Sequence, residues 1–331
     1  MSPKTNMELT NIGAVIVTWN SSATVERCLE SCSGLTVTVV DNASSDDTAA
    51  RVRRYPHVFL IENSENRGFA AAVNQGIARS PAEYILLLNP DVELTGSIAP
   101  LQTACEANAV IATGRLTDDA GETQTGFTVR RLPRPATLAF EVLGLNRVIP
   151  SNPVNRRYRC TDMPLDQPAD IEQPPGAFLF FKKDLWNVLG GFDEQFAPVW
   201  FEDVDFCKRA LDRGPIRYLP SVTARHRGGA SIARMDWGCR ELCWYGSLLR
   251  YASKHFSPRQ FRGVCGAVVL ASAIRMAPAV LERRTFRALA VYAKTAGLAL
   301  RGFASGRLVD PGRDEQFQQG SRVRTITNST Q

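Results

Sequence analysis

Short apolar segments alternate with helical segments over the first hundred residues, and this alternation constrains the fold more than any other feature of the chain. The apolar segments are rich in Val, Ile and Leu at nearly every position, which is typical of parallel strands buried on both faces. They lie at 12–17, 37–40, 58–61 and 84–88, and the longest helical segment between them is 69–79. The pattern therefore predicts an α/β fold, with a mainly parallel mixed sheet and helices on both faces.

The alternation weakens after Thr117. Eight prolines and a group of arginines fall within 130–175, so we expect a long irregular segment of a kind that often carries function. Further strands are expected at 177–181 and 216–219. Helices are expected from Ser45 to Arg54, after Asp184, after Trp200, at 237–256, from a capping box at Ser257–Gln260, and at about 279–301.

Charge is distributed unevenly along the 331 residues. Residues 1–205 hold 17 Lys or Arg against 26 Asp or Glu, whereas residues 206–331 hold 22 against 7. A net charge of −9 is thus followed by one of +15, which indicates a polyanionic partner for the C-terminal third. Nucleic acid is not the expected partner, because the aromatic residues of this part follow helical spacing and do not interleave with the arginines.

The ends of the chain and its cysteines indicate the compartment. Met1–Asn11 is polar and predicts no secretory signal. The apolar run 263–274 ends at Arg275 and is shorter than the roughly 20 residues of a membrane span, so no transmembrane helix is expected. Eight scattered cysteines lack the paired spacing of zinc sites, and we expect free, mostly buried thiols in a cytoplasmic protein.

Polar residues follow each of the predicted parallel strands. They are 18–20 (Thr-Trp-Asn), 41–42 (Asp-Asn), 66–68 (Asn-Arg-Gly) and 89–91 (Asn-Pro-Asp). Open α/β sheets bind ligands at this edge, so four such sites together predict a binding site there. The chain has neither a Gly-rich dinucleotide fingerprint nor a Walker-type loop, so a nucleotide would be held by side chains and a metal.

Two polar positions have both a chemical and a structural interpretation. Asp91, after a buried strand, could hold a divalent cation that neutralises a diphosphate, or could be a turn residue after Pro90. His226 lies in a predicted Gly-flanked basic loop and could be a ligand or a structural histidine.

Three carboxylates open the helix predicted after Trp200. Glu202, Asp203 and Asp205 could cap this helix, since acidic groups are favourable at a helix N-terminus. Three within four residues exceed what a cap needs, and the preceding aromatic residues indicate partial burial. Burial would raise a carboxyl pKa and suit a general base.

Several strings carry a resemblance to a known family: 39–46 (VVDNASSD), 66–70 (NRGFA), 74–76 (NQG), 87–92 (LLNPDV), 190–194 (GGFDE), 201–205 (FEDVD) and His226. Together they resemble the family 2 inverting glycosyltransferases of the GT-A fold, in a rhamnosyltransferase-like branch. The resemblance extends from about residue 12 to residue 232.

This resemblance implies a role for each matched position. Asp203 would be the catalytic base that deprotonates the acceptor hydroxyl, with Glu202 orienting the acceptor or sharing that role. Asp91 would hold Mg²⁺ or Mn²⁺ at the donor diphosphate, with His226 completing the coordination. Since the motif is Asn-Pro-Asp rather than Asp-x-Asp, one carboxylate is left for the metal. The nucleotide-sugar-binding residues would be Thr18, Asn20, Asp41, Asn66, Arg67, Asn74 and Asn89.

The same resemblance divides the chain and names its substrates. Residues 1–115 would form the nucleotide-sugar-binding half and 116–232 the acceptor-binding and catalytic half of one GT-A domain, followed by a basic amphipathic helical extension (233–301) and a disordered tail (302–331). The expected reaction moves L-rhamnose from dTDP-rhamnose to a polyprenyl-diphosphate-linked or other cell-surface glycan. The alternatives are another donor, such as UDP-galactofuranose or a UDP-hexose, and a non-catalytic sugar-nucleotide or glycan-binding relative.

Residues 225–301 add physical support for a lipid-linked acceptor. They carry 14 Lys or Arg against three Asp or Glu, within helices that have apolar faces. Such helices suit peripheral binding to the anionic inner face of the plasma membrane. Alternatively, they pack on the catalytic domain and expose solvated arginines.

Overall fold

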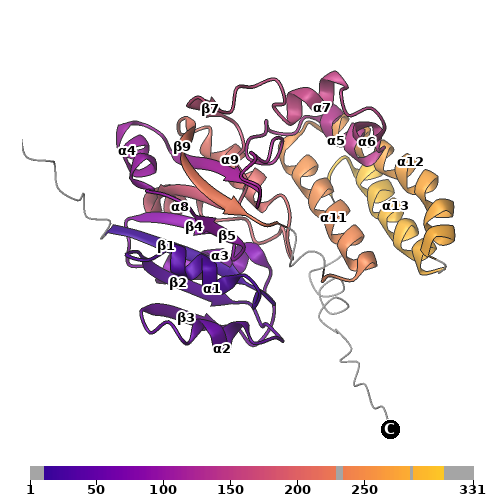
Figure 1. Cartoon of the computed structure of the whole chain (residues 1–331). Helices are drawn as coiled ribbons and strands as arrows, with labels where there is room; N and C mark the ends of the chain where they lie inside the picture. The colour runs from indigo at the N-terminus through magenta and orange to yellow at the C-terminus, as the bar shows by residue number, and fades with distance from the viewer. Residues whose placement is uncertain (1–10, 229–233, 284–285, 309–331) are drawn as a thin grey trace, which may run out of the picture. The chain divides into compact units, whose positions relative to one another are not determined.

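The computed structural model describes residues 11–228, 234–283 and 286–308, and the chain forms two compact units that divide between Arg234 and Met235 (Figure 1). The sequence expectation of a disordered tail from 302 falls largely on residues 309–331, which lie outside the described residues.

The N-terminal unit is built on one nine-stranded sheet. Its strands are β1 (Ile12–Thr18), β2 (Thr36–Asp41), β3 (Val58–Glu62), β4 (Tyr84–Leu88), β5 (Val92–Leu94), β6 (Ile111–Thr117), β7 (Ala169–Ile171), β8 (Phe178–Lys182) and β9 (Ile216–His226). Their order is β3-β2-β1-β4-β8-β6-β9-β5, with β7 also paired to β9. The first four strands in this order are parallel, whereas β8 is antiparallel to both of its neighbours. The predicted mixed α/β sheet is therefore confirmed.

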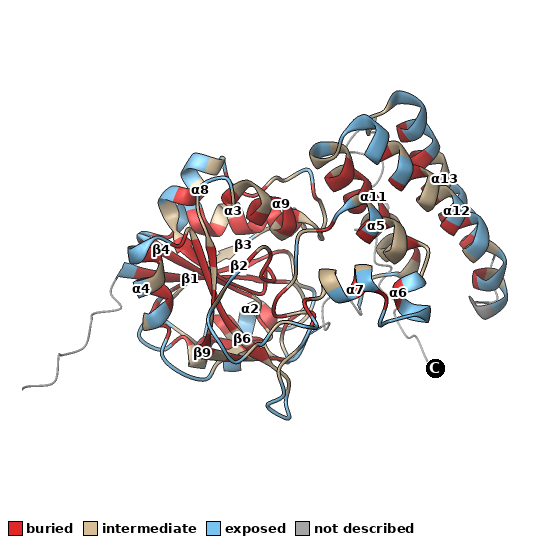
Figure 2. Cartoon of the chain, turned by 90° about the horizontal axis from the view of Figure 1, so that it is seen from above, coloured by how far each residue is buried: buried red, intermediate tan, exposed pale blue. Residues whose placement is uncertain are grey.

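Helices cover both faces of this sheet, and the strand residues divide between the two cores. In β1, Ile12, Ala14 and Ile16 pack with helices α1 (Val25–Ser31), α2 (Thr48–Val52) and α4 (Ala99–Ala107). Val15 and Val17 point to the other face, toward α3 (Phe69–Arg79), α8 (Lys183–Leu189) and α9 (Glu202–Ala210). The two-residue period of a strand thus explains why β1 is apolar at consecutive positions, and its burial between helices is visible in Figure 2.

Helix α2 and strand β9 have boundaries that differ from the sequence expectation. Helix α2 begins at Thr48 rather than Ser45, because Ser44, Ser45 and Asp46 are used in a polar turn with Asn20 and Asp41. Strand β9 continues through His226, so this histidine ends a strand and does not lie in a loop.

The proline-rich stretch 130–175 is also more regular than expected. It contains α5 (Pro135–Val142), α6 (Leu145–Val148), α7 (Pro153–Tyr158) and the strand β7. Pro135 and Pro153 stand at the first positions of their helices, where a missing N–H costs nothing, so these prolines start helices rather than prevent them.

The C-terminal unit consists of helices α11 (Trp237–His255), α12 (Pro258–Arg283) and α13 (Arg287–Ser305). The expected capping box is present, since Ser257 N–H donates to Gln260 Oε1 (3.0 Å) and Gln260 N–H donates to Ser257 Oγ (3.4 Å). The last helix begins at Arg287 and not near 279, because α12 extends to Arg283.

By length and composition alone, α12 could cross a membrane, over Pro258–Leu281. This differs from the sequence expectation, which considered only the unbroken apolar run 263–274. The helix continues past both ends of that run with few charges. A third of its most apolar window is buried, which is less than in a core helix, where most residues are buried.

Candidate active site

The ends of β1 and β2 form the first part of the site. Thr18 and Asp41 are register partners in the parallel pair, and Thr18 Oγ1 donates to Asp41 Oδ1 at 2.8 Å. The hydroxyl and the N–H of Ser44 also donate to this carboxylate, at 2.6 and 3.0 Å. Thr18 and Asp41 are almost fully buried. The structure therefore brings two of the predicted nucleotide-binding residues into one fixed pair.

Asn42 organises the loop 63–68 between β3 and α3. The sequence analysis did not place Asn42 among the site residues. Its Nδ2 donates to Asn66 Oδ1 (2.8 Å) and to the Gly68 carbonyl (3.2 Å), while its Oδ1 accepts from the Arg67 and Asn63 amides (3.0 and 3.1 Å). This side chain, 2% exposed, thus joins β2 to residues 63–68. It holds Asn66 in place and leaves the Arg67 side chain exposed at the same edge.

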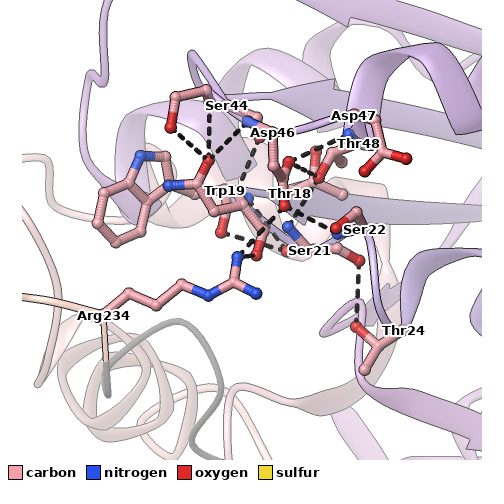
Figure 3. A network of polar contacts seen from close by, with 12 residues as sticks. Thr18, Trp19, Ser21, Ser22, Thr24, Ser44, Asp46, Asp47, Thr48 and Arg234 are labelled. Carbon is pink, nitrogen blue, oxygen red and sulfur yellow. Dashed lines mark hydrogen bonds and ion pairs between the residues drawn. The ribbon is translucent and has the colours of Figure 1, made fainter. Parts of the chain in front are cut away.

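Figure 3 shows the polar turns that lie beside this pair. Asn20, in a left-handed conformation, accepts from Ser45 and Asp46 amides through Oδ1 (2.7 and 3.3 Å). Arg234 reaches the same turns and donates to the Asn20 carbonyl and to Asp46 Oδ2 (3.2 Å). Burial opposes ionisation of Asp46, but hydrogen bonds from Thr48 and Ser22 outweigh it and lower its pKa to about 2. Arg234 thus adds a cation that the sequence analysis missed, since no motif contains it.

Asn74, one of the predicted nucleotide-sugar-binding residues, makes its hydrogen bonds with other protein groups. Its Nδ2 donates to the Phe192 carbonyl (2.8 Å) and to Glu194 Oε1 (3.1 Å), and its Oδ1 accepts from Trp186 Nε1 and the Phe192 amide (both 2.9 Å). All four hydrogen-bonding positions of the amide are therefore used. Asn74 therefore holds the 190–194 loop onto α3, and its assignment to the nucleotide-sugar site stays a prediction.

Strand pairing brings Asp91 and His226 together across 135 residues of sequence. Val92 of β5 is the register partner of His226 in β9, and the Arg227 amide donates to the Asp91 carbonyl (3.2 Å). His226 Nε2 lies 3.7 Å from Asp91 Oδ1. That oxygen is buried and has no hydrogen-bond partner in the described part of the chain. Burial lowers the pKa of His226 and so favours the neutral ring. The negative charge of Asp91 acts in the opposite direction but does not outweigh burial.

These two side chains suit a divalent cation. A buried carboxylate oxygen without a donor, facing an imidazole nitrogen, is an arrangement that a bound cation would satisfy. Within the described residues, no group of three or more His, Cys, Asp or Glu side chains is close enough to form a metal site. Among the described residues, Asp91 and His226 would thus be the two side chains that hold such a cation.

Three arginines line a shallow pocket beside Asp91: Arg27, Arg225 and Arg227, together with Thr24 and Cys28. Arg225 pairs with Glu93 (3.3 Å) and Arg227 with Asp119 (3.1 Å). The positive charges of these arginines offset the negative charges of Asp91 and Glu93. They therefore reduce the electrostatic repulsion of an anion that enters this pocket.

Asp203 lies in the first turn of α9 and accepts hydrogen bonds from two backbone amides. Gly176 N–H donates to its Oδ2 and its own neighbour Val204 donates to its Oδ1, both at 2.8 Å. Burial raises the pKa of Asp203, and these amide hydrogen bonds offset the rise in part. A Cβ at position 176 would lie 3.0 Å from Asp203 Cβ, so the close approach favours glycine there. The result is an oriented carboxylate whose pKa lies above its ordinary value, as a general base requires.

Glu202, next to it, is in a more apolar setting. It is 4% exposed, and its Oε2 is buried without a partner among the described residues. Burial, and then the charge of Asp203, raise its pKa well above the ordinary value, so this carboxyl is neutral more readily than Asp203. Trp200 and Phe201 before it have φ of 81° and 69°, a strained backbone for bulky residues of the kind found at functional sites.

Gly176 and Ala177 connect the two carboxylate centres. Gly176 N–H holds Asp203, while the Ala177 carbonyl accepts from Asn89 N–H (3.1 Å), two residues before Asp91. Asn89 thus contributes through its backbone. The antiparallel pairing of β4 with β8, next to each other in the sheet, produces this connection.

The sheet order, the strand-end polar cluster and the paired carboxylate centres define a GT-A glycosyltransferase fold. Residues 14–187 match the model of the family described as "Glycosyl transferase family 2". The chain therefore belongs to the family 2 glycosyltransferases, and it is a glycosyltransferase.

Three known proteins illustrate this relationship. An N-acetylglucosaminyl-diphospho-decaprenol L-rhamnosyltransferase of Mycobacterium tuberculosis is 30% identical over 241 residues, covering 66% of this chain and 77% of that protein. A pre-mycofactocin glycosyltransferase of the same species is 26% identical over 260 residues, covering 74% of this chain and 48% of that protein. The crystal structure of GalNAc-T7 with UDP, GalNAc and Mn²⁺ has a TM-score of 0.50 at 13% identity, over 67% of this chain and 45% of that one, which supports the fold alone.

Proposed function

We propose that this protein is a divalent-cation-dependent inverting glycosyltransferase that moves L-rhamnose from dTDP-rhamnose to a polyprenyl-diphosphate-linked sugar. The observation that carries the cation dependence is the buried Asp91 Oδ1, unpartnered and 3.7 Å from His226 Nε2. The similarity to a rhamnosyltransferase that acts on a decaprenol-linked sugar supports the donor and the acceptor.

The residues divide the chemistry between them. A bound cation would supply positive charge to the donor diphosphate, and Asp91 and His226 would hold it. Asp203 accepts the proton of the acceptor hydroxyl while the hydroxyl oxygen forms a bond to the anomeric carbon. The bond from that carbon to the diphosphate oxygen breaks on the opposite side, and the nucleoside diphosphate leaves with the electron pair. Glu202, with its raised pKa, would donate a hydrogen bond that orients the acceptor.

The C-terminal unit has a surface suited to the lipid of such an acceptor. Residues 235–308 carry 12 Lys or Arg and three Asp or Glu. Exposed apolar side chains recur at helical spacing on two helices: Leu270, Ile274 and Leu281 on α12, and Phe286, Leu289 and Leu300 at and along α13. Arg287, Lys294 and Arg301 recur every seven residues on α13. An apolar stripe with flanking cations fits the interface of an anionic bilayer.

Transfer assays with purified protein test the catalytic proposal. We expect radiolabelled rhamnose to move from dTDP-rhamnose to a short polyprenyl-diphosphate-GlcNAc in Mn²⁺ or Mg²⁺, and not in EDTA, with inverted anomeric configuration. UDP-galactofuranose and UDP-hexoses serve as competing donors. Preference for one of them would contradict the rhamnose assignment, and undiminished transfer in EDTA would contradict the role of the cation.

Vesicle sedimentation tests the membrane surface separately. Leu281→Asp with Phe286→Asp should reduce binding to vesicles that contain phosphatidylglycerol, because charge is costly in the apolar interface. Val148→Asp is the matched control, since Val148 is equally exposed (77%) but lies in the N-terminal unit. Equal binding by all variants would contradict this surface.

A further inference from the structure

Gln124 contacts His226 through both ends of its side-chain amide. Its Oε1 lies 2.8 Å from His226 Nδ1, and its Nε2 donates to the His226 backbone carbonyl at 2.7 Å. Gln124 itself is anchored, because its N–H donates to the Leu116 carbonyl (3.0 Å) and its carbonyl accepts from Phe127 and Thr128 N–H (both 3.0 Å). It comes from the irregular segment after β6, 102 residues before His226.

The backbone contact determines which way the Gln124 amide points. A carbonyl oxygen can only accept a hydrogen bond, so the atom facing the His226 carbonyl must be the NH₂ group. The remaining oxygen then faces Nδ1, and since it can only accept, Nδ1 must carry a hydrogen. In the neutral ring the lone pair is consequently on Nε2, which is the nitrogen that lies 3.7 Å from Asp91 Oδ1.

Packing fixes the ring plane as well. The Phe127 ring stacks on the imidazole with centroids 4.9 Å apart and an interplanar angle of 6°. A Cβ at Gly228 would lie 3.2 Å from His226 Cε1, so the backbone also approaches the ring closely. Phe127 and Gly228 restrict tilting of the ring, whereas the contact of Nδ1 with Gln124 at 2.8 Å distinguishes the ring from its flipped form.

We propose that Gln124 is a positioning residue that fixes the Nδ1–H tautomer of His226, so that Nε2 and Asp91 Oδ1 converge on one divalent cation. The proposal rests on the cation site of the proposed function, but the tautomer is a property of the metal-free protein. A nitrogen ligand suits Mn²⁺ better than Mg²⁺, so Gln124 also favours Mn²⁺ in the competition between these two ions.

Nitrogen NMR of the metal-free protein tests the tautomer directly. The chain has three histidines, so long-range ¹H–¹⁵N spectra of ¹⁵N-histidine-labelled protein are simple, and His57→Gln and His255→Gln identify the other two. We expect His226 to carry its hydrogen on Nδ1 in the wild type and in Gln124→Glu, which keeps an acceptor oxygen. In Gln124→Leu we expect a mixture with the Nε2–H form. An Nε2–H ring in the wild type, or an unchanged Nδ1–H ring in Gln124→Leu, would overturn the proposal.

Mn²⁺ affinity, measured by the EPR signal of free Mn²⁺ without donor or acceptor, provides the second readout. We expect Gln124→Leu to weaken binding by about 10- to 100-fold, the usual effect of removing a hydrogen bond that orients a metal ligand. Gln102→Leu is the matched control, because this buried glutamine donates to Glu106 on its own helix α4, and it should leave binding unchanged. Wild-type affinity in Gln124→Leu would overturn the role of Gln124 alone, whereas no Mn²⁺ binding by the wild type would overturn the cation site itself.

Discussion

The two ends of the site differ in how their buried polar groups are satisfied. At the ends of β1 and β2, Asp41 accepts three hydrogen bonds and Asn42 makes four, all from neighbouring protein groups. At the other end, Asp91 Oδ1 and Glu202 Oε2 are buried without partners among the described residues. Leaving such a group unpaired costs about 1–3 kcal/mol. Each of these two oxygens therefore lowers the free energy of unfolding of the ligand-free protein.

We infer from this difference that the hydrogen-bonded residues at the ends of β1 and β2 maintain the shape of the site, whereas Asp91 and Glu202 take part in binding and chemistry. A saturated cluster keeps the strand ends in one shape before any ligand arrives. Unpartnered oxygens can be satisfied by a cation or a substrate hydroxyl, so binding recovers part of the cost of keeping them buried. Substitutions at the first end should therefore affect folding, and substitutions at the second should affect chemistry.

The largest expected effect on chemistry comes from Asp203→Asn. It keeps the size of the side chain and an oxygen for the Gly176 amide but removes the base, so transfer should fall by about 10²- to 10⁴-fold. Donor affinity, measured by calorimetry, should stay within about threefold of wild type. Asp193→Asn provides a comparison in the neighbouring loop, and normal turnover by Asp203→Asn would show that another group is the base.

The largest expected effect on folding comes from Asn42→Ala. Four hydrogen bonds of a nearly buried side chain are lost, and the Gly68 carbonyl and the Arg67 N–H lose the partner that Asn42 provides. The free energy of unfolding should therefore fall by about 2–4 kcal/mol in a denaturant titration. The exposed Asn187 of α8 offers a control, and its replacement by Ala should cost less than about 0.5 kcal/mol. A loss below about 1 kcal/mol at Asn42 would remove the contrast between the two ends.

Much of this arrangement could be predicted from the sequence because it depends on local patterns. The apolar runs predict the parallel strands that the structure contains, and of the polar residues after them, Thr18 and Asp41 meet at the ends of β1 and β2. The prolines of 130–175 were misleading because the same residue interrupts a helix internally and favours its first turn, where Pro135 and Pro153 stand.

Contacts between distant segments could not be predicted in the same way. The register of β5 with β9 determines that Asp91 and His226 meet, and no local pattern encodes that register. Gln124 lies in no motif, and its role depends on an irregular segment reaching a strand end. The four contacts of Asn74, which join α3 to the 186–194 segment, likewise depend on residues more than 100 positions away.

A smaller, pH-dependent effect is expected from Glu202→Gln. The native pKa of Glu202 is raised by burial, so the folded protein keeps a proton that the unfolded chain loses above about pH 4.3. This stabilisation is complete at low pH and is lost as pH rises toward the native pKa. Wild type should therefore lose stability relative to Glu202→Gln by up to about 1.4 kcal/mol per pH unit in that window.

Denaturant titrations of the metal-free protein from pH 4 to pH 8 measure this difference. Glu65→Gln, at an exposed position, should give a pH profile parallel to wild type. A parallel profile for Glu202→Gln would mean that Glu202 is not a buried, readily protonated carboxyl.

The most direct measurement of the central claim compares one variant from each end of the site. The affinity of dTDP and of UDP is measured by calorimetry in Mn²⁺ and in EDTA, for wild type, Asp91→Asn and Ser44→Ala. We predict that Mn²⁺ strengthens wild-type binding at least about tenfold, that Asp91→Asn abolishes this gain, and that Ser44→Ala weakens binding equally in both conditions. A full Mn²⁺ effect in Asp91→Asn, or its loss in Ser44→Ala, would contradict the division between a structural end and a chemical end.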